Sequence, residues 1–277
     1  MNAALARVAI HGVPRSGTSW LGEIFNSNPW TIYKYQPLFS YALKGFLTPD
    51  STTADIDEFF RRLAVLDDDF LDQATKRKAG ALPRFQKEEP PHVVDKEFRY
   101  HHILPNLLLQ DAGIRLVAIV RNPLAVLASW LEAPREFRRD LGWTAREEWK
   151  HAPKKNLGRP EEFYGYARWK EAALLFGALA AEHPGRVRVV CYRDLIWRSE
   201  SVVRGLFEFC SLPFAGQTLE FLARSRASEH PDPYSVFRVA PGDERWRSVV
   251  DPAIVEEVLA DLAGTDLERY LEEAPGA

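Results

Sequence analysis

Apolar and polar positions along the chain predict short strands that alternate with amphipathic helices. Runs of apolar residues typical of buried strands cover residues 7–11, 92–95, 115–120 and 187–192. Helical spacing and helix-boundary residues predict helices at 20–25, 54–66, 67–78, 103–109, 161–182, 199–211 and 252–263, with a further one that begins at Pro123. This alternation predicts an α/β fold, in which a parallel sheet is covered by helices on both faces.

Two stretches interrupt the alternation. Residues 36–90 contain several prolines, and residues 133–160 are basic and irregular. Long excursions between strands usually cover a binding site and carry its specificity. In parallel sheets of this kind, ligands bind at the carboxyl ends of the strands. We therefore expect one domain, residues 1–277, in which both insertions contribute to a binding site at that end.

Composition excludes several classes of protein. A hydrophobic fraction of 46% with 27% charged residues is ordinary for a globular chain with its own core. The net charge of −3 gives no general attraction to nucleic acid or to an anionic membrane, so an anion site must come from local clusters. No apolar run approaches the roughly 20 residues of a membrane span. We expect a cytoplasmic protein without a signal peptide or a transmembrane segment.

Cysteine and metal chemistry are not expected. The two cysteines, Cys191 in a predicted strand and Cys210 on a predicted helix, are too few for a disulfide framework. Two buried thiols are the expected state. Histidine, cysteine and acidic residues form no cluster at metal-ligand spacing along the sequence, so the sequence predicts no metal site.

The first strand and the residues that follow it carry the strongest chemical signal. A strand, a glycine-containing turn and the start of a helix point backbone N–H groups and a helix dipole at one spot. The spacing nearly matches the nucleoside-triphosphate loop, because Gly12, Gly17 and Ser19 are in place. However, Thr18 stands where that loop has lysine, and the cation is Arg15, inside the turn. The pattern predicts a phosphate cradle without the triphosphate chemistry.

A family motif matches this loop. The segment Pro14-Arg15-Ser16-Gly17-Thr18-Ser19-Trp20 resembles the 5′-phosphosulfate loop of sulfotransferases that use 3′-phosphoadenosine 5′-phosphosulfate (PAPS). The following segment, from Ile24 to Pro37, resembles the carbohydrate 6-O-sulfotransferase branch of that family. The resemblance implies that PAPS is the co-substrate and that it contacts Arg15, Ser16, Gly17, Thr18, Ser19 and Trp20. It also implies in-line attack of an acceptor hydroxyl on sulfur, which releases adenosine 3′,5′-bisphosphate. Because arginine keeps its proton at ordinary pH, Arg15 must act electrostatically.

A second motif follows the predicted strand 115–120. Arg121 precedes a helix, and Ser129 lies two turns into it. Arginine offers a planar fork of donors that suits phosphate, and serine adds a hydroxyl. In the PAPS-dependent family an arginine and a serine eight residues later hold the 3′-phosphate, and the resemblance implies this role for Arg121 and Ser129. The structural alternative is an arginine at a strand end and a serine in an ordinary helix.

Two further segments resemble cofactor contacts of the family. The segment that begins at Tyr192 resembles a turn in which tyrosine lies against the adenine and aspartate, here Asp194, helps to fix the loop. The region where the family closes a basic loop over the cofactor holds Arg238, Arg245, Trp246 and Arg247. Tyr192, Arg245 and Trp246 are therefore candidate cofactor contacts. A buried structural tyrosine and a solvated basic surface are the alternatives.

The catalytic residues are matched less completely. After the second predicted strand the family supplies a lysine for the sulfuryl oxygens and, in several branches, a histidine as base. Lys96 matches the lysine, whereas Phe98 stands at the histidine. The glutamate that serves as base in the 6-O branch is here Gln36, which cannot accept a proton at neutral pH. Glu97 is the first candidate for the base. The alternatives, which titrate in the right range, are His101 and His102.

The acceptor is predicted only as a class: a carbohydrate, a glycolipid or another small metabolite. Candidates for stacking on a sugar or a phenol, with helix packing as the alternative, are Trp143, Trp149 and Trp169. Cations that either steer an acidic acceptor or form a solvated face are Arg135, Arg138, Arg139, Arg146, Lys150, Lys154 and Lys155. Two other functions stay open. A phosphate-loop metabolite kinase would require magnesium and ATP, and a non-catalytic nucleotide-binding module would bind without turnover.

Overall fold

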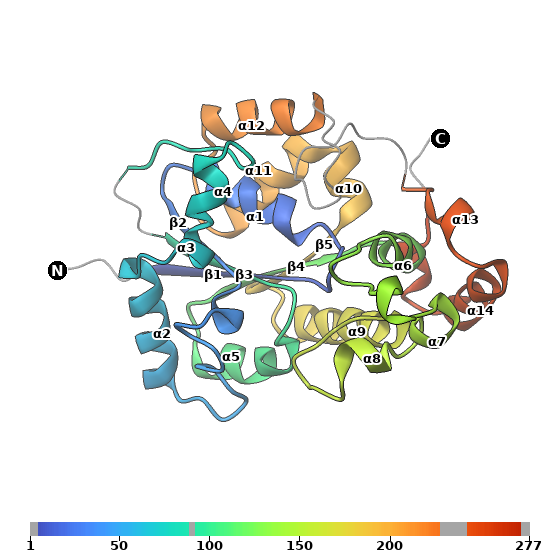
Figure 1. Ribbon diagram of the computed structural model, residues 1–277. Coiled ribbons are helices and arrows are strands. Elements are labelled where there is room, and N and C mark those ends of the chain that lie inside the picture. Colours follow the sequence, from blue (N-terminus) through green and yellow to red (C-terminus); the bar gives the residue numbers. More distant parts are fainter. Residues whose placement is uncertain (1–4, 89–91, 228–242, 273–277) are drawn as a thin grey trace.

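Five parallel strands form the centre of the protein in a computed structural model, which describes residues 5–88, 92–227 and 243–272 (Figure 1). The strands are β1 (Ala6–His11), β2 (Thr31–Tyr35), β3 (His92–Glu97), β4 (Arg115–Val120) and β5 (Val187–Cys191). They pair in the order β2-β3-β1-β4-β5, and every neighbouring pair is parallel. The strand order reverses beside β1, which is the place where ligands bind in such sheets. The predicted fold class is confirmed.

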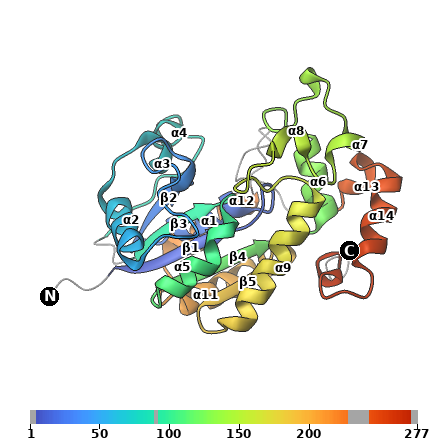
Figure 2. The same cartoon turned by 90° about the horizontal axis from the view of Figure 1, so that it is seen from below.

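Helices cover both faces of the sheet. One face carries α1 (Thr18–Asn26), α10 (Tyr192–Trp197), α11 (Ser199–Phe209) and α12 (Gly216–Ala227). The other carries α2 (Thr53–Val65), α5 (Leu104–Gln110) and α9 (Tyr166–Glu182). The remaining helices are α3 (Asp69–Asp72), α4 (Ala74–Lys78), α6 (Pro123–Leu131), α7 (Ala145–Glu148), α8 (Pro153–Asn156), α13 (Trp246–Val249) and α14 (Pro252–Leu262). Figure 2 shows α3 and α4 beside β2, and α7 and α8 beside α6.

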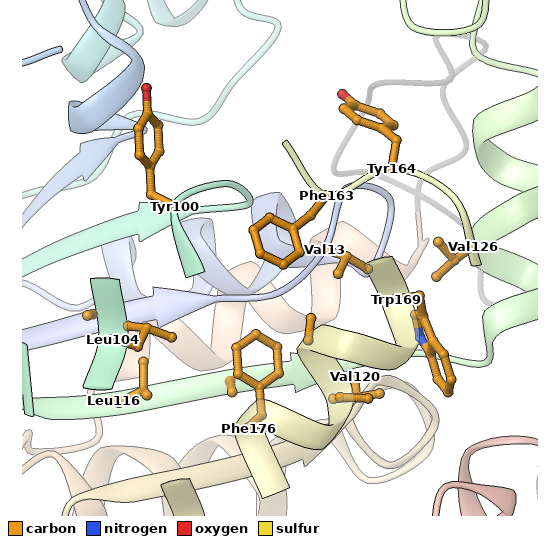
Figure 3. Close-up of a cluster of buried hydrophobic side chains, with 14 of the residues drawn as sticks. Val13, Tyr100, Leu104, Leu116, Val120, Val126, Phe163, Tyr164, Trp169 and Phe176 are labelled. Atoms are coloured by element: carbon orange, nitrogen blue, oxygen red, sulfur yellow. The ribbon is translucent and has the colours of Figure 1, made fainter. Parts of the chain in front are cut away.

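Two hydrophobic layers, one on each face, hold the helices to the sheet. Successive residues of a strand point to opposite faces. Ala9 of β1 therefore belongs to the layer under α2, α5 and α9, and Ile10 belongs to the layer under α1 and α11. Figure 3 shows the first layer, in which Leu116 of β4 lies near Leu104 of α5 and Phe176 of α9. Burial on both faces explains why the central strands are continuous apolar runs in the sequence.

The apolar pattern does not predict β2, because Lys34 interrupts it. The structure buries Lys34, whose Nζ donates to the Leu66 carbonyl oxygen and forms an ion pair with Asp72 at 2.7 Å. A buried charge needs such partners. Since they come from distant parts of the chain, no local pattern could show that this lysine belongs to a strand.

Three other boundaries differ from the prediction. The helix expected at 161–182 begins only at Tyr166, because Gly165 before it has φ 85° and Glu162 forms a buried ion pair with Arg99 at 3.0 Å. The helix expected at 67–78 is split into α3 and α4 by Gln73, whose φ of 51° is left-handed. The predicted strand 187–192 ends at Cys191, and its last residue begins α10 instead. No element was predicted at the position of α12.

Three predicted absences concern the chain as a whole. In the ranges 5–88, 92–227 and 243–272, no helix is long and apolar enough to cross a membrane, and no group of three His, Cys, Asp or Glu could hold a metal ion. Cys191 and Cys210 are free thiols. Cys210 is buried, whereas Cys191 is only partly buried, so the expectation of two buried thiols is wrong for Cys191.

Candidate functional site

The loop between β1 and α1 has the backbone of an anion cradle. Arg15 (φ 71°) and Gly17 (φ 91°) take left-handed conformations, and the Ser16 N–H donates to the Val13 carbonyl oxygen at 3.2 Å. Helix α1 begins at Thr18. Its N-cap residue is Gly17, which has no side chain to accept a hydrogen bond from the first turn. The N–H groups of its first turn are therefore available to an anion.

Two glycines bring this loop against its neighbours. A Cβ at Gly12 would lie 2.6 Å from the Ile119 carbonyl oxygen, so glycine lets the loop pack directly on β4. A Cβ at Gly17 would lie 2.5 Å from the ring of Tyr192. Tyr192 thus covers the loop from the start of α10, and its ring centroid lies 4.6 Å from Cζ of Arg121.

Replacing Gly17 with alanine is expected to lower the free energy of unfolding by about 2–4 kcal/mol. Left-handed strain contributes about 1 kcal/mol, and displacement of the Tyr192 ring contributes the rest. The matched control is Gly264→Ala, because Gly264 is also left-handed (φ 71°) but a Cβ at this position would meet no described atom within 4 Å. Urea unfolding measures both variants. Equal losses would show that Tyr192 does not press on the loop.

The structure brings the two phosphate motifs into contact. Arg121 Nη1 donates to the Arg15 carbonyl oxygen at 2.8 Å, and Arg15 Nε donates to Ser129 Oγ at 3.0 Å. Arg121 also binds Asp243, since its Nε donates to the two carboxylate oxygens at 3.0 and 2.9 Å and its Nη2 donates to one of them. Although burial opposes the charge, the Asp243 carboxylate raises the pKa of Arg121. The Arg121 fork therefore already holds an anionic group.

Among the predicted cofactor and sulfuryl contacts, Ser16 and Lys96 have fully buried side chains. Ser16 Oγ and Lys96 Nζ have no hydrogen-bond partner among the described residues. Lys96 Nζ instead lies 4.2 Å from the ring centroid of Tyr35 and 4.7 Å from that of Phe98. Burial lowers the pKa of Lys96 to about 7. Because a buried ammonium is costly without an anionic partner, a bound anion would stabilise its charged form.

The three predicted candidates for the base are enclosed to different degrees. Glu97 is fully buried, its Oε1 accepts the Leu38 N–H at 2.8 Å, and burial raises the pKa of Glu97 to about 8. His101 is also fully buried, with Nδ1 3.0 Å from Nδ1 of His11, and burial lowers the pKa of His101 well below its ordinary value. Burial also lowers the pKa of His102, which is half-buried. Their role as base stays a prediction.

The raised pKa of Glu97 predicts a pH-dependent stability. The folded chain keeps the Glu97 proton between about pH 4.5 and 8, where the unfolded chain has released it. The stability that this proton confers is present below about pH 4.5 and is lost as the pH rises through about 8. Glu97→Gln removes the titration. As the pH rises from about 5 to about 8, we therefore expect the free energy of unfolding of the variant to increase by at least about 2 kcal/mol relative to that of wild type.

Urea unfolding of both proteins at several pH values measures this difference. Lys96 titrates nearby with the opposite sign, but both proteins contain it, so the difference reports mainly on Glu97. Glu147→Gln, an exposed change, should show no such trend. A constant difference between Glu97→Gln and wild type across the pH range would mean that Glu97 is ionised in the folded chain.

A pocket of about 350 Å³ opens at the carboxyl ends of β2 and β3. Its aromatic walls are Tyr35, Phe39, Phe70, Phe98 and Tyr164. Its polar lining includes Gln36, Lys76, Arg99, Glu136 and Lys155. Figure 3 shows that Phe163 and Tyr164 point apart, so that the ring of Phe163 enters the hydrophobic layer and the Tyr164 hydroxyl points away from it. The lining includes residues from both predicted insertions.

The remaining predicted cofactor contacts are bound to other parts of the protein. Trp20 Nε1 donates to Ser225 Oγ of α12 at 3.0 Å. The Arg245 side chain is 75% exposed and pairs with Glu132, and Trp246 is buried in the core. Cofactor binding by Trp20, Arg245 and Trp246 stays a prediction, and Arg238 lies outside the described residues. Asp194 forms ion pairs within its own segment, with Arg193 and Arg198.

The second insertion divides its charges between solvent and the pocket. Exposed ion pairs join Arg138 to Asp140, Lys154 to Glu147 and Lys150 to Glu257. Arg135 and Lys155 instead line the pocket. Trp149 and Trp169 are core residues, as the packing alternative predicts, and Trp143 packs against Phe137. The aromatic walls of the pocket are tyrosines and phenylalanines instead.

Several residues of the site were not assigned a role from the sequence, and three of them carry later arguments. They are Glu136, Tyr164 and Asp243. Tyr164 lies where a helix was expected, and Glu136 is one of four acidic residues in the basic stretch 133–160. Nothing in the local sequence distinguishes Glu136 from the other three acids. Asp243 lies 122 positions from its partner Arg121, so sequence proximity gives no sign of this contact.

A parallel sheet whose central strand leads into a phosphate loop defines a P-loop-type α/β protein. The family model described as "Sulfotransferase domain" matches residues 5–230, and the chain belongs to this family. None of the curated proteins searched matches the sequence.

Solved structures share the fold. A mouse sulfotransferase, SULT7A1, complexed with PAP (adenosine 3′,5′-bisphosphate) is 15% identical with a TM-score of 0.53, and the match covers 98% of this chain and 89% of that one. The sulfotransferase domain of the Synechococcus PCC 7002 olefin synthase is 18% identical with a TM-score of 0.53, over 96% and 98%. Retinol dehydratase in a complex with retinol and PAP is 14% identical with a TM-score of 0.51, over 96% and 84%.

Proposed function

We propose that the chain transfers the sulfuryl group of PAPS to the hydroxyl of a carbohydrate, a glycolipid or another small metabolite. Family membership supports sulfuryl transfer, and the PAP complexes among the similar structures support PAPS as the donor. The observation that carries the proposal is the contact of Arg15 with both Arg121 and Ser129, which joins two motifs more than 100 residues apart. A metabolite kinase would not require this contact, so the kinase alternative does not explain it.

Two observations support the fit of the site residues to PAPS. Arg121 holds the Asp243 carboxylate with the same fork of donors that a 3′-phosphate requires. Ser16 Oγ and Lys96 Nζ are buried and lack a hydrogen-bond partner in the described ranges, which suits the oxygens of a 5′-phosphosulfate. We assign Arg121 and Ser129 to the 3′-phosphate and residues 15–20 to the 5′-phosphosulfate. When bound, PAPS supplies a sulfuryl group on a stabilised phosphate leaving group.

The site residues supply charge where the reaction needs it. The acceptor oxygen bonds to sulfur while the bond from sulfur to the 5′-phosphate oxygen breaks, and the hydroxyl proton passes to a base. Negative charge builds on the bridging and sulfuryl oxygens, as it does in phosphoryl transfer. Arg15 and Lys96 are assigned to stabilise that charge, because preorganised donors of this kind give large rate effects. The leaving bisphosphate is an anion that needs no proton.

The pocket supports a small acceptor with a flat or weakly polar face. Five aromatic rings line it, and such rings pack against sugars and planar ring systems alike. Its lining from both insertions supports the expectation that these segments select the acceptor. The retinol complex of a similar structure supports a small alcohol as one possible acceptor class.

Calorimetric titration with adenosine 3′,5′-bisphosphate, beside ATP with magnesium, tests the proposal first. Micromolar binding of the bisphosphate and none of ATP is expected. Transfer of ³⁵S from labelled PAPS to a panel of sugars, glycolipids and small alcohols then identifies the acceptor. Preference for magnesium-ATP would favour the kinase, and bisphosphate binding without transfer to any acceptor or to water would favour a non-catalytic module.

A further inference from the structure

Glu136 lies in the pocket close to the phosphate loop. It belongs to the turn after α6, where its N–H donates to the Ala133 carbonyl oxygen at 2.9 Å. The buried ring of Phe137 packs against Trp130 at a centroid distance of 5.2 Å and anchors this turn. Glu136 lines the pocket, and its Oε1 lies 4.0 Å from Nη1 of Arg15. The carboxylate is therefore held between the loop and the acceptor pocket.

The Glu136 carboxylate faces charged and titratable groups from several elements. Burial, followed by the negative charge of Glu136, raises the pKa of Tyr35 to about 12, and the same two causes raise the pKa of Tyr164 well above its ordinary value. Its charge also acts on Lys96 from β3 and on Lys155 from α8. Other ionisable groups that line the pocket are Asp69, Lys76, Arg99 and Arg135.

Glu136 retains an acceptor site for a proton. Its Oε2 is buried and has no hydrogen-bond partner in the part of the chain that the structure describes. The other carboxylate in the described pocket lining, Asp69, is exposed and accepts hydrogen bonds from the N–H and the hydroxyl of Thr75. Glu97 Oε2 is likewise buried without a described partner, but Glu97 is not among the described lining residues and burial raises its pKa to about 8.

We infer that Glu136 is the general base of the sulfuryl transfer, an inference that rests on the proposed function. Its Oε2 accepts the proton of the acceptor hydroxyl as the acceptor oxygen bonds to sulfur and the bond from sulfur to the bisphosphate breaks. Arg15, whose Nη1 lies beside the other carboxylate oxygen of Glu136, stabilises the negative charge that builds on the transferred group. A positioned base contributes roughly 10²–10⁴ in rate. Glu136 thus supplies the group that Gln36 and Phe98 cannot.

Two probe acceptors that share a nitrophenyl ring separate a base from a structural residue. The hydroxyl of 4-nitrobenzyl alcohol is weakly acidic and needs a base, whereas 4-nitrophenol ionises readily in water and does not. We compare kcat for ³⁵S transfer from PAPS in wild type, Glu136→Gln, Glu136→Asp and the exposed control Glu147→Gln. If wild type uses neither probe, release of sulfate from PAPS to water is the readout, because water also needs a base.

Glu136→Gln is expected to lose about 10²–10³ in kcat with the benzyl alcohol and less than about tenfold with the ionised phenol. We expect kcat of wild type to fall at low pH, and this fall should disappear in the variant. Glu136→Asp should restore part of the rate, and bisphosphate affinity should stay within about threefold in every variant. Glu147→Gln should behave as wild type.

Equal losses with both probes, or no loss with the benzyl alcohol, would overturn the inference. A large drop in bisphosphate affinity for Glu136→Gln would also overturn it, because Glu136 would then act by positioning Arg15. Failure of the proposed function looks different: wild type itself would neither bind the bisphosphate nor release sulfate from PAPS.

Discussion

Arg15→Ala is expected to reduce the rate of sulfuryl transfer by about 10²–10³, the typical effect of removing one preorganised donor from a developing oxyanion. The Arg15 guanidinium is held at the loop by Ser129 and lies beside Glu136, so its direction is set before substrate binds. Arg15→Lys keeps the charge but loses the fork, and we expect it to retain partial activity. Initial rates of ³⁵S transfer from PAPS measure the three proteins.

Arg138→Ala is the matched control for Arg15→Ala. Arg138 forms an exposed ion pair with Asp140, away from the pocket lining, and its loss should leave the rate unchanged. Circular dichroism and bisphosphate titration show whether the Arg15 variant folds and still binds. Wild-type rates in Arg15→Ala would refute the assignment of Arg15 to the transferred group.

Arg121→Ala is expected to weaken binding of adenosine 3′,5′-bisphosphate by about 10–100-fold. Hydrogen bonds to a charged group contribute about 1.5–3 kcal/mol, and Arg121 offers several from one planar fork. The backbone at this position should be unaffected, because the Arg121 carbonyl oxygen still accepts the Trp169 Nε1–H at 2.9 Å. Calorimetric titration measures the affinity.

Asp243→Asn tests the same site by changing the partner of Arg121. The Asp243 carboxylate occupies the Arg121 fork, so a 3′-phosphate must displace it. An uncharged amide competes less, and we expect the variant to bind the bisphosphate several-fold more tightly. If Asp243→Asn weakened binding, or Arg121→Ala left it unchanged, the 3′-phosphate would have to bind elsewhere.

The central strands could be predicted because burial on both faces leaves a local mark. Consecutive apolar residues at 115–120 indicate β4 without any knowledge of its neighbours. β2 has no such mark, because Lys34 in its middle is neutralised by partners that follow it by more than 30 positions. The late start of α9 could not be predicted for the same reason, because Glu162 forms an ion pair with Arg99, which is distant in the sequence.

The candidate site divides in the same way. Arg15, Arg121 and Ser129 could be singled out because loop spacing and a strand-to-helix turn carry their positions in the sequence. Glu136 and Asp243 could not, because each meets its arginine only after more than 100 intervening residues have folded. No spacing rule connects such residues.

The sequence by itself determined the strand-and-helix alternation, the phosphate loop and the family motifs, because side-chain alternation and glycine freedom act over a few neighbouring residues. Only the tertiary structure decided which carboxylate is enclosed, which one lines the pocket and where the pocket opens. Enclosure of β3 raises the pKa of Glu97 to about 8, whereas Glu136 stands in a turn that lines the pocket, beside Arg15. Desolvation depends on everything packed around a group, and that surrounding comes from the whole chain.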